Sequence, residues 1–343
     1  MKRTLFRRLC AAMLAVCLMV LTTAVGASAL GAQTKSQVRT AEQTADAAGF
    51  DLSAYAEKLT DLLDVELTGD VAADVGNLLN NAKVYNLLIV GVDSRKNDYA
   101  GRSDAMMVLS VNPLSGKLVL TSLLRDSYVD IPGHGKNRLN TAYDLGGISL
   151  LKKTIKQNYS IRLDAYVVVN FNDLIDFVDD IGGIDMEVTK TEVQYINTYT
   201  AAQNKELYGK KTNPDALSVK GGNLHLNGMQ ALAYARIRYV GLDFGRTQRQ
   251  RKVISASLKQ LFSRPVTEQV PVVAKYLTRV KTDITVPELL FLVLVYGTID
   301  RYEVRSMALP VEGTYKNQRV SGMDVLVVDL PANRAAWKTA VGV

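Results

Sequence analysis

Residues 84–122 read VYNLLIVGVDSRKNDYAGRSDAMMVLSVNPLSGKLVLTS, and this stretch decides the fold class. It opens with a nearly continuous apolar run, Val84–Val92, which predicts a strand buried on both faces. Two further strands are predicted over Ala105–Val111 and Lys117–Ser122. The turn-forming residues Asn112-Pro113-Leu114-Ser115-Gly116 lie between these two strands, so they are predicted to pair as a hairpin.

The chain beyond this hairpin alternates between predicted helices and predicted strands. Helices are predicted over residues 147–158, 172–180, 246–262 and 287–296, and another is capped by Asn227 and runs to Tyr234. Strands are predicted over residues 165–169, 184–188, 302–308 and 325–329. This order predicts a single α/β domain with a central mixed β-sheet and helices on both of its faces.

The N-terminus carries the pattern of a membrane-directed segment. Four basic residues come first, Lys2, Arg3, Arg7 and Arg8. The strongly apolar run Leu9–Val25 follows, which is short for a membrane-spanning helix. Because Ala27-Ser28-Ala29 comes next, an uncleaved anchor and a cleaved secretory signal both fit. Either interpretation places the rest of the chain outside the cytoplasm, since the basic end stays inside.

The pattern divides the chain into three parts. Residues 1–30 are predicted to form a short cytoplasmic end plus the membrane anchor or signal segment. Residues 31–80, rich in Ala, Thr, Asp and Gln, are predicted to be a stalk or linker. Residues 81–343 are predicted to form the folded domain. The expected location is therefore the cell membrane, with one pass and an extracytoplasmic domain, or a secreted form if the segment is cleaved.

Composition excludes several classes of site. The two cysteines, Cys10 and Cys17, both lie in the N-terminal apolar run, so the domain has no disulfide framework, thiolate zinc site or cysteine nucleophile. Two histidines, His134 and His225, are too few for a multi-histidine metal site. Without the four N-terminal basic residues the formal charge falls from +7 to about +3, which argues against nucleic acid as a partner.

Two polar clusters follow predicted strands. Asp93 comes directly after the first strand and Asp104 precedes the second, so their carboxylates can converge on a hard cation such as Mg²⁺. The alternative is that each aspartate caps its own loop. Arg125 and Asp126 directly follow an apolar strand, and alone they are typical of a solvated sheet edge.

A third cluster is strongly basic and points to an anion. Arg236 and Arg238 share one side only if the chain is extended there, because residues two apart diverge on a helix. Gly245 predicts a tight turn, after which Arg246 and Gln250 share one helical face. The helix start predicted at Arg246 would add free N–H groups and a positive dipole end, which suits a pyrophosphate.

A solvated basic helix face is the alternative interpretation of this cluster. It accounts for Arg249, Arg251 and Lys252, but it does not account for the arginines at 236 and 238.

Together these clusters resemble the LytR-CpsA-Psr family over residues 84–255. The resemblance rests on NLLIVGVDSR at 86–95, GRSD at 101–104, RDSYVDIPG at 125–133, KNRLNTAY at 136–143, VNF at 169–171 and the block at 236–250. The family implies a phosphotransferase that moves a glycopolymer from a polyprenyl-pyrophosphate carrier to peptidoglycan, with Mg²⁺ as cofactor. Teichoic acid, capsule and other wall glycans all fit this expectation, and the partners expected are the lipid-linked glycopolymer, peptidoglycan and the membrane.

The resemblance also implies residue roles. Asp93 and Asp104 are expected to hold the metal. Arg125, Arg236, Arg238, Arg246 and Gln250 are expected to bind the pyrophosphate, with Asp93, Asp104, Arg125 and Asp243 as the catalytic set. Asp93 and Asp243 are both candidates for the general base. Two other functions stay open, a pyrophosphatase that releases the polymer to water and a non-enzymatic carrier-binding or transcriptional-attenuator protein.

Overall fold

The computed structural model describes residues 71–80, 83–94, 99–218, 220–239 and 242–343. The predicted membrane segment, residues 1–30, and most of the predicted stalk lie outside these residues. Within the described part of the chain, none of the helices combines the length and the apolar character needed to cross a bilayer.

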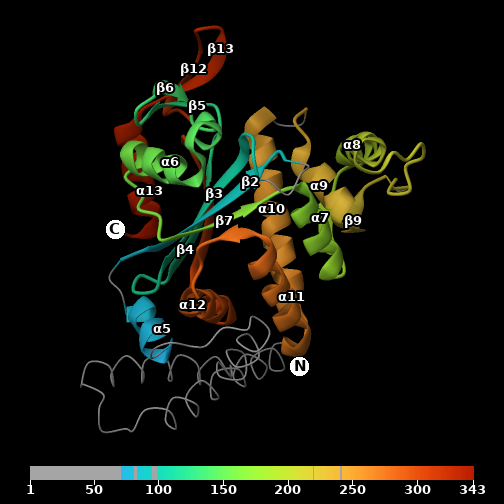
Figure 1. Cartoon of the computed structure of the whole chain (residues 1–343), viewed down its shortest axis with the longest axis horizontal. Coiled ribbons are helices and arrows are strands. Elements are labelled where there is room, and N and C mark those ends of the chain that lie inside the picture. Colours follow the sequence, from blue (N-terminus) through green and yellow to red (C-terminus); the bar gives the residue numbers. More distant parts are fainter. Residues whose placement is uncertain (1–70, 81–82, 95–98, 219, 240–241) are drawn as a thin grey trace.

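A six-stranded mixed sheet forms the centre of the molecule (Figure 1). Its strands, in spatial order, are β10 (Lys281–Thr282), β7 (Ala165–Val169), β2 (Tyr85–Val92), β3 (Ser103–Asn112), β4 (Lys117–Leu123) and β11 (Glu303–Leu309). β2, β3 and β4 are antiparallel neighbours, and β3 and β4 form the predicted hairpin. β7 lies parallel to β2, and β11 lies parallel to β4. The predicted central mixed sheet is therefore confirmed.

Helices cover both faces of this sheet, as the period-two alternation of its strands requires. Leu88 and Val90 of β2 pack on one face with α6 (Thr141–Tyr159) and α13 (Leu330–Val341). Leu87 and Ile89, which alternate with them along the strand, pack on the other face with α5 (Val71–Asn80) and α12 (Val286–Gly297). The near-continuous apolar run of β2 follows from this burial on both sides.

The helix α5 lies inside residues 31–80, which the sequence assigns to the stalk. Its Val75 is fully buried and its Leu79 nearly so, and both belong to the same core as Phe291 of α12. Residues 71–80 are therefore packed on the domain.

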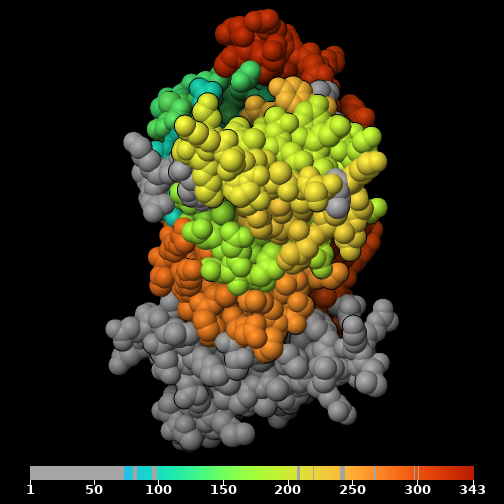
Figure 2. Space-filling model, turned by 90° about the vertical axis from the view of Figure 1, so that its right-hand side faces the viewer, coloured from blue at the N-terminus to red at the C-terminus, as the bar shows by residue number. Residues whose placement is uncertain are grey.

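A second layer packs beside the sheet and forms the face seen in Figure 2, in yellow and light green. It contains α7 (Phe171–Asp180), α8 (Lys190–Tyr208), α9 (Gly228–Arg236), α10 (Leu242–Ser263), α11 (Val266–Arg279) and the ribbon of β8 (Ile184–Val188) with β9 (Gly222–Leu226). Asn170, Thr189 and Asn227 start α7, α8 and α9 with reciprocal capping boxes. Gly228 lets α9 approach α7 closely, since a Cβ there would collide with the backbone of Ile175.

A smaller four-stranded sheet stands at one end of the molecule, at the top of Figure 1. Its order is β12 (Tyr315–Val320), β13 (Met323–Val328), β5 (Ser127–Ile131) and β6 (Gly135–Arg138). A short 3₁₀ helix, η1 (Ile299–Arg301), precedes β11. His134 lies in the tight β5–β6 connection, where its amide donates to the carbonyl of Ile131.

Several elements differ from the sequence-based expectation. The elements β5, β6, β9, β10, β12, α8, α11 and α13 are additions to it. α10 begins at Leu242, so Gly245 lies inside this helix and the predicted turn there is wrong. The other expected helices and strands are present with ends shifted by a few residues. The helix predicted from residue 147 is the main part of α6, which kinks at Gly146 and Gly147.

Candidate functional site

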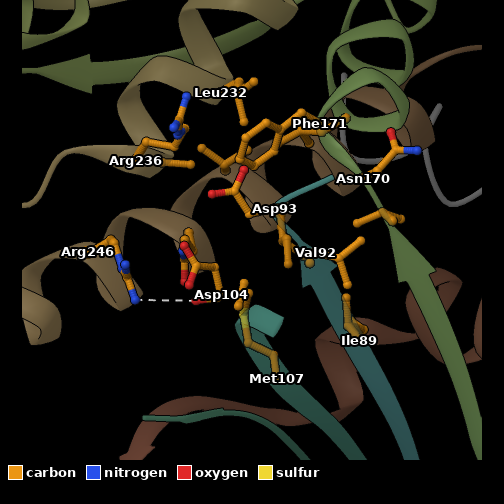
Figure 3. Close-up of a pocket in the computed structure, with 18 of the residues that line it drawn as sticks. Ile89, Val92, Asp93, Asp104, Met107, Asn170, Phe171, Leu232, Arg236 and Arg246 are labelled. Atoms are coloured by element: carbon orange, nitrogen blue, oxygen red, sulfur yellow. Dashed lines mark hydrogen bonds between the residues drawn. The ribbon is translucent and has the colours of Figure 1, made fainter. Parts of the chain in front are cut away.

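A cavity of about 400 Å³ lies at the edge of the central sheet where β2 and β7 end. These strands are parallel, so their carboxyl ends meet at one edge, where α/β sheets commonly bind ligands. Residues from α7, α8, α9 and α10 form the other walls. The cavity brings together six of the residues singled out from the sequence, Asp93, Asp104, Arg236, Arg238, Arg246 and Gln250 (Figure 3).

A β-bulge aims Asp104 into this cavity. Gly91 of β2 pairs with Ala105, whereas Val92 pairs with Ser103, so Asp104 is the extra residue between the two pairs. Bulges disrupt the ladder locally and redirect a side chain, and they are frequent beside active sites. Asp104 therefore lies within β3, not before it, and Asp93 follows the last residue of β2.

Three arginines from distant parts of the chain converge on Asp104. One carboxylate oxygen accepts from Nη1 of Arg125 at 2.8 Å, and the other accepts from Nη2 of Arg238 at 3.4 Å. Nη2 of Arg246 donates to the backbone carbonyl of Asp104 at 3.3 Å, the dashed line of Figure 3. Arg125 does not line the cavity itself and reaches it through Asp104.

The cationic residues of the cavity differ in exposure. Arg246 is only 3% exposed, whereas the side chain of Arg238 is 51% exposed. Arg236 ends α9, and its guanidinium carbon lies 4.6 Å from the ring centroid of Phe171, a cation–π contact that orients it. A buried guanidinium lies in a medium of low dielectric constant, where its attraction for an anion is stronger than in water.

The solvated-face interpretation of Arg249 and Arg251 is wrong. Arg249 is 4% exposed, donates to the carbonyl of Ile237 at 2.8 Å and forms an ion pair with Glu192 at 3.5 Å. It thereby fixes the backbone between Arg236 and Arg238. Arg251 donates to the hydroxyl of Ser122 at 2.7 Å, and burial lowers the pKa of its guanidinium. Only Lys252 of the three is exposed.

The helix-terminus part of the predicted anion site is also wrong. Because α10 begins at Leu242, Arg246 lies in its second turn, and it reaches the cavity through its side chain alone. Asp243 belongs to the first turn of α10, but its side chain lies outside the described atoms. Arg236 ends a helix and Arg238 follows it in non-helical chain, so both side chains can line one cavity.

Apolar side chains make up much of the remaining wall of the cavity. It includes Ile89 and Met107 from the sheet, Leu232 from α9, and Val253 and Ile254 from α10. In Figure 3 the labelled arginines lie on one side of the view, and Ile89 and Met107 lie on the other. Val169 of β7 also lines the cavity. The very apolar helix α12 does not line it, because its side chains pack in the core. The site can therefore hold a molecule that joins an anionic part to an apolar part.

The sequence does not reveal the roles of some site residues, although Asn170 and Phe171 belong to the quoted motif at 169–171. Asn170 lines the cavity, and its side chain accepts a hydrogen bond from the amide of Asp173. In the sequence, an Asn three residues before an Asp is typical of a capping box, so Asn170 reads as a helix cap and not as a cavity residue. Phe171 supports Arg236, and Arg249 fixes the chain between the two cavity arginines. These roles depend on contacts across the fold, which spacing along the chain does not reveal.

Comparison with known proteins finds similar relatives. "Regulatory protein MsrR" of Staphylococcus aureus (strain COL) is 30% identical over 269 residues, 77% of this chain and 76% of the relative. "Polyisoprenyl-teichoic acid--peptidoglycan teichoic acid transferase TagU" of Enterococcus faecalis is 34% identical over 224 residues, 64% of this chain and 67% of the relative.

A solved structure shares the fold. YwtF (TagT) of Bacillus subtilis "with bound octaprenyl pyrophosphate lipid" matches with a TM-score of 0.55 and 24% identity, over 76% of this chain and 91% of that one. The model of the LytR_cpsA_psr family matches residues 37–341, nearly all of the chain beyond its N-terminus. The resemblance in the sequence motifs is thereby confirmed, and the chain belongs to the LytR_cpsA_psr family.

Proposed function

We propose that this protein is a phosphotransferase that moves a glycopolymer from a polyprenyl-pyrophosphate carrier to peptidoglycan during cell-wall assembly. One observation carries the proposal, namely that Arg236, Arg238 and Arg246 share a single cavity with many apolar side chains. The arginines suit a pyrophosphate and the apolar wall suits a prenyl chain, which are the two ends of such a carrier. The transferase name of one relative and the lipid bound by another support the same choice.

The proposed reaction is a phosphoryl transfer in which positioning and charge stabilisation dominate. The acceptor hydroxyl attacks the phosphorus that carries the glycan. The bond from this phosphorus to the bridging oxygen then breaks, and polyprenyl phosphate leaves. Arg236, Arg238 and Arg246 bind the phosphate oxygens and stabilise the charge that develops on the leaving group. Asp93 or Asp243 takes the proton of the hydroxyl.

The carboxylates present fit the Mg²⁺ expected for this family. Asp93 and Asp104 line the same cavity, and Mg²⁺ is typically held by one or two carboxylates together with substrate phosphates and water. Within the described residues no cluster of three or more acidic, His or Cys ligands exists, so the protein alone offers no complete cage. Bound there, Mg²⁺ would neutralise the pyrophosphate and improve the leaving group.

The same proposal includes a location. A basic end followed by an apolar segment favours one membrane pass with the domain outside the cytoplasm, where peptidoglycan is assembled. A prenyl carrier stays in the membrane, so an anchored domain meets it without leaving the surface. A reporter fused to the C-terminus should be active only if that end is outside the cytoplasm.

The test is transfer of a labelled lipid-linked glycan to soluble peptidoglycan oligomers by the purified full chain. We expect a covalent glycan–peptidoglycan product that needs both the acceptor and Mg²⁺. Release of free polymer at the same rate with and without acceptor would identify a pyrophosphatase instead. Tight lipid binding without any turnover would identify a carrier-binding regulator, which the name of MsrR would fit.

A further inference from the structure

A second cavity, of about 490 Å³, lies between the small sheet and the start of α10. Its lining comes from the residues that follow β4, from Phe244 of α10 and from the β12–β13 hairpin. Cavities of this size are typical of small-molecule sites. None of the functional proposals above uses it, and among the expected site residues whose side chains the structure describes, only Arg125 lines it.

The charges of the second cavity balance, unlike those of the first. It is lined by two cations, Arg125 and Arg319, and by two anions, Asp126 and Asp324. Asp126 forms ion pairs with Arg125 and with Arg138, each at 3.4 Å. A pyrophosphate would meet no excess of positive charge here, so a second phosphate site is a poor fit.

The other lining groups suit a neutral polyhydroxyl ligand. The side chain of Asn317, on the same face of β12 as Tyr315, is exposed and makes no hydrogen bond to the described residues, which leaves its amide donor and acceptor available. Phe244 and Tyr315 stack with ring centroids 5.7 Å apart and an interplanar angle of 27°. The C–H face of a sugar ring, which carries partial positive charge, packs well on the negative face of an aromatic ring.

The two cavities meet at one ion pair. Arg125 lines the second cavity, and its Nη1 donates at 2.8 Å to Asp104, which lines the first. Phe244 lines the second cavity and Arg246, two residues later on α10, lines the first. A molecule in the second cavity is therefore adjacent to the phosphate site, as an attacking hydroxyl must be.

Arg138 holds the hairpin side of this cavity in place. Its guanidinium donates twice to the backbone carbonyl of Asp324, at 2.8 and 3.1 Å, and also pairs with Asp126. β13 is parallel to β5 with Leu326 opposite Ser127, which ties the hairpin to the strand after Arg125. The lining is thus anchored to the same segment that contacts Asp104.

We propose that the second cavity binds the saccharide acceptor, with Tyr315 and Phe244 packing on a sugar ring and Asn317, on the same face of β12 as Tyr315, bonding its hydroxyl and amide groups. This inference rests on the proposed transfer function and adds the site of the second substrate. Because the cavity lies across the Arg125–Asp104 pair from the arginine cluster, the acceptor hydroxyl approaches the phosphate from the side of Arg125.

The test measures the acceptor KM with muramic-acid-containing disaccharide-peptide oligomers at saturating lipid-linked donor. We expect Tyr315→Ala and Asn317→Ala each to raise the acceptor KM by roughly 10-fold, as loss of one packing or polar contact does. The Kd of the lipid-linked donor should stay within about twofold, since no donor contact is lost. Lys316→Ala is the matched control, because Lys316 is exposed on the same strand and does not line the cavity.

Direct binding makes the outcome independent of turnover and of variant folding. Addition of the same oligomers to the wild-type full chain should slow amide hydrogen exchange over residues 315–326. An unchanged acceptor KM in folded Tyr315→Ala and Asn317→Ala, or protection elsewhere, would overturn the acceptor assignment. A wild-type protein that transfers nothing yet shows protection here would retain the saccharide site and contradict the proposed transfer instead.

Discussion

The two cavities differ in the burial and in the balance of their charged side chains. In the first, Arg246 is buried and Arg236 packs on Phe171, and an apolar wall stands opposite them. In the second, Asn317 and Gln318 are exposed on a hairpin, and cations and anions balance. A buried, oriented guanidinium loses little entropy when it binds an anion, so the first cavity is suited to strong charge recognition. The second is suited to a neutral ligand held by several weaker contacts.

The largest expected effect on the transfer rate comes from a substitution in the first cavity. Replacing Arg246 by Lys keeps the charge but loses the planar fork that binds two phosphate oxygens at once. We expect single-turnover transfer to slow by ~10²–10³-fold, by analogy with loss of one oxyanion-stabilising donor. The measurement is the rate of transfer of a lipid-linked glycan at fixed ionic strength.

Two further variants control this experiment. Arg238→Lys repeats the change at an exposed position, so a loss there does not depend on packing. Lys252→Ala removes an exposed charge on the same helix outside the cavity and should change the rate little. Equal and salt-sensitive losses in all three variants would instead indicate a diffuse electrostatic surface.

The sequence predicts most of the sheet because its core strands carry strong local signals. β2 is apolar at nearly every position and β7 matches its predicted bounds, since burial on both faces leaves no room for polar residues. β12 has the sequence YKNQRV and is mostly exposed, so it lacks the apolar alternation from which a strand is predicted. Pro271 in the sequence suggests that a helix breaks there, but α11 continues through it.

The candidate site was predictable as a set of residues but not as a geometry. Motif spacing brings Asp93, Asp104 and the arginines to attention, yet the bulge that aims Asp104 depends on its pairing with β2. In the same way, Arg249 looks like its exposed neighbour Lys252 until α8 supplies Glu192 as its partner. Sequence periodicity does not report such contacts between distant segments.

The next largest effect concerns the two aspartates of the first cavity, of which Asp104 also contacts Arg125 of the second. We expect Asp93→Ala and Asp104→Ala each to slow transfer by roughly 10²-fold and to weaken its dependence on Mg²⁺, because a hard cation loses a carboxylate ligand. The assay is a Mg²⁺ titration of the transfer rate for each variant.

The two variants should differ in one respect. Asp104→Ala also removes the partner of Arg125 and Arg238, so it should raise the acceptor KM, whereas Asp93→Ala should not. A double variant that responds to Mg²⁺ as the wild type does would place the metal elsewhere.

The smallest expected effect concerns His225, which lines neither cavity, and it separates stability from chemistry. His225 on β9 has Nδ1 2.7 Å from Asp185 on β8 and Nε2 2.8 Å from the carbonyl of Gly182. The hydrogen bond to Asp185 raises the pKa of His225 above its ordinary value of 6.5. The protonated form is therefore favoured by folding, and this stability is fully present below pH 6.5 and is lost as the pH rises through the higher folded pKa. Both side chains are more than half exposed, so we expect a loss of only ~0.5 kcal/mol or less.

His225→Gln should abolish this pH-dependent part of the urea unfolding free energy and leave the pH profile of transfer unchanged. A shifted transfer profile in His225→Gln would show that the ribbon of β8 and β9 is coupled to the first cavity.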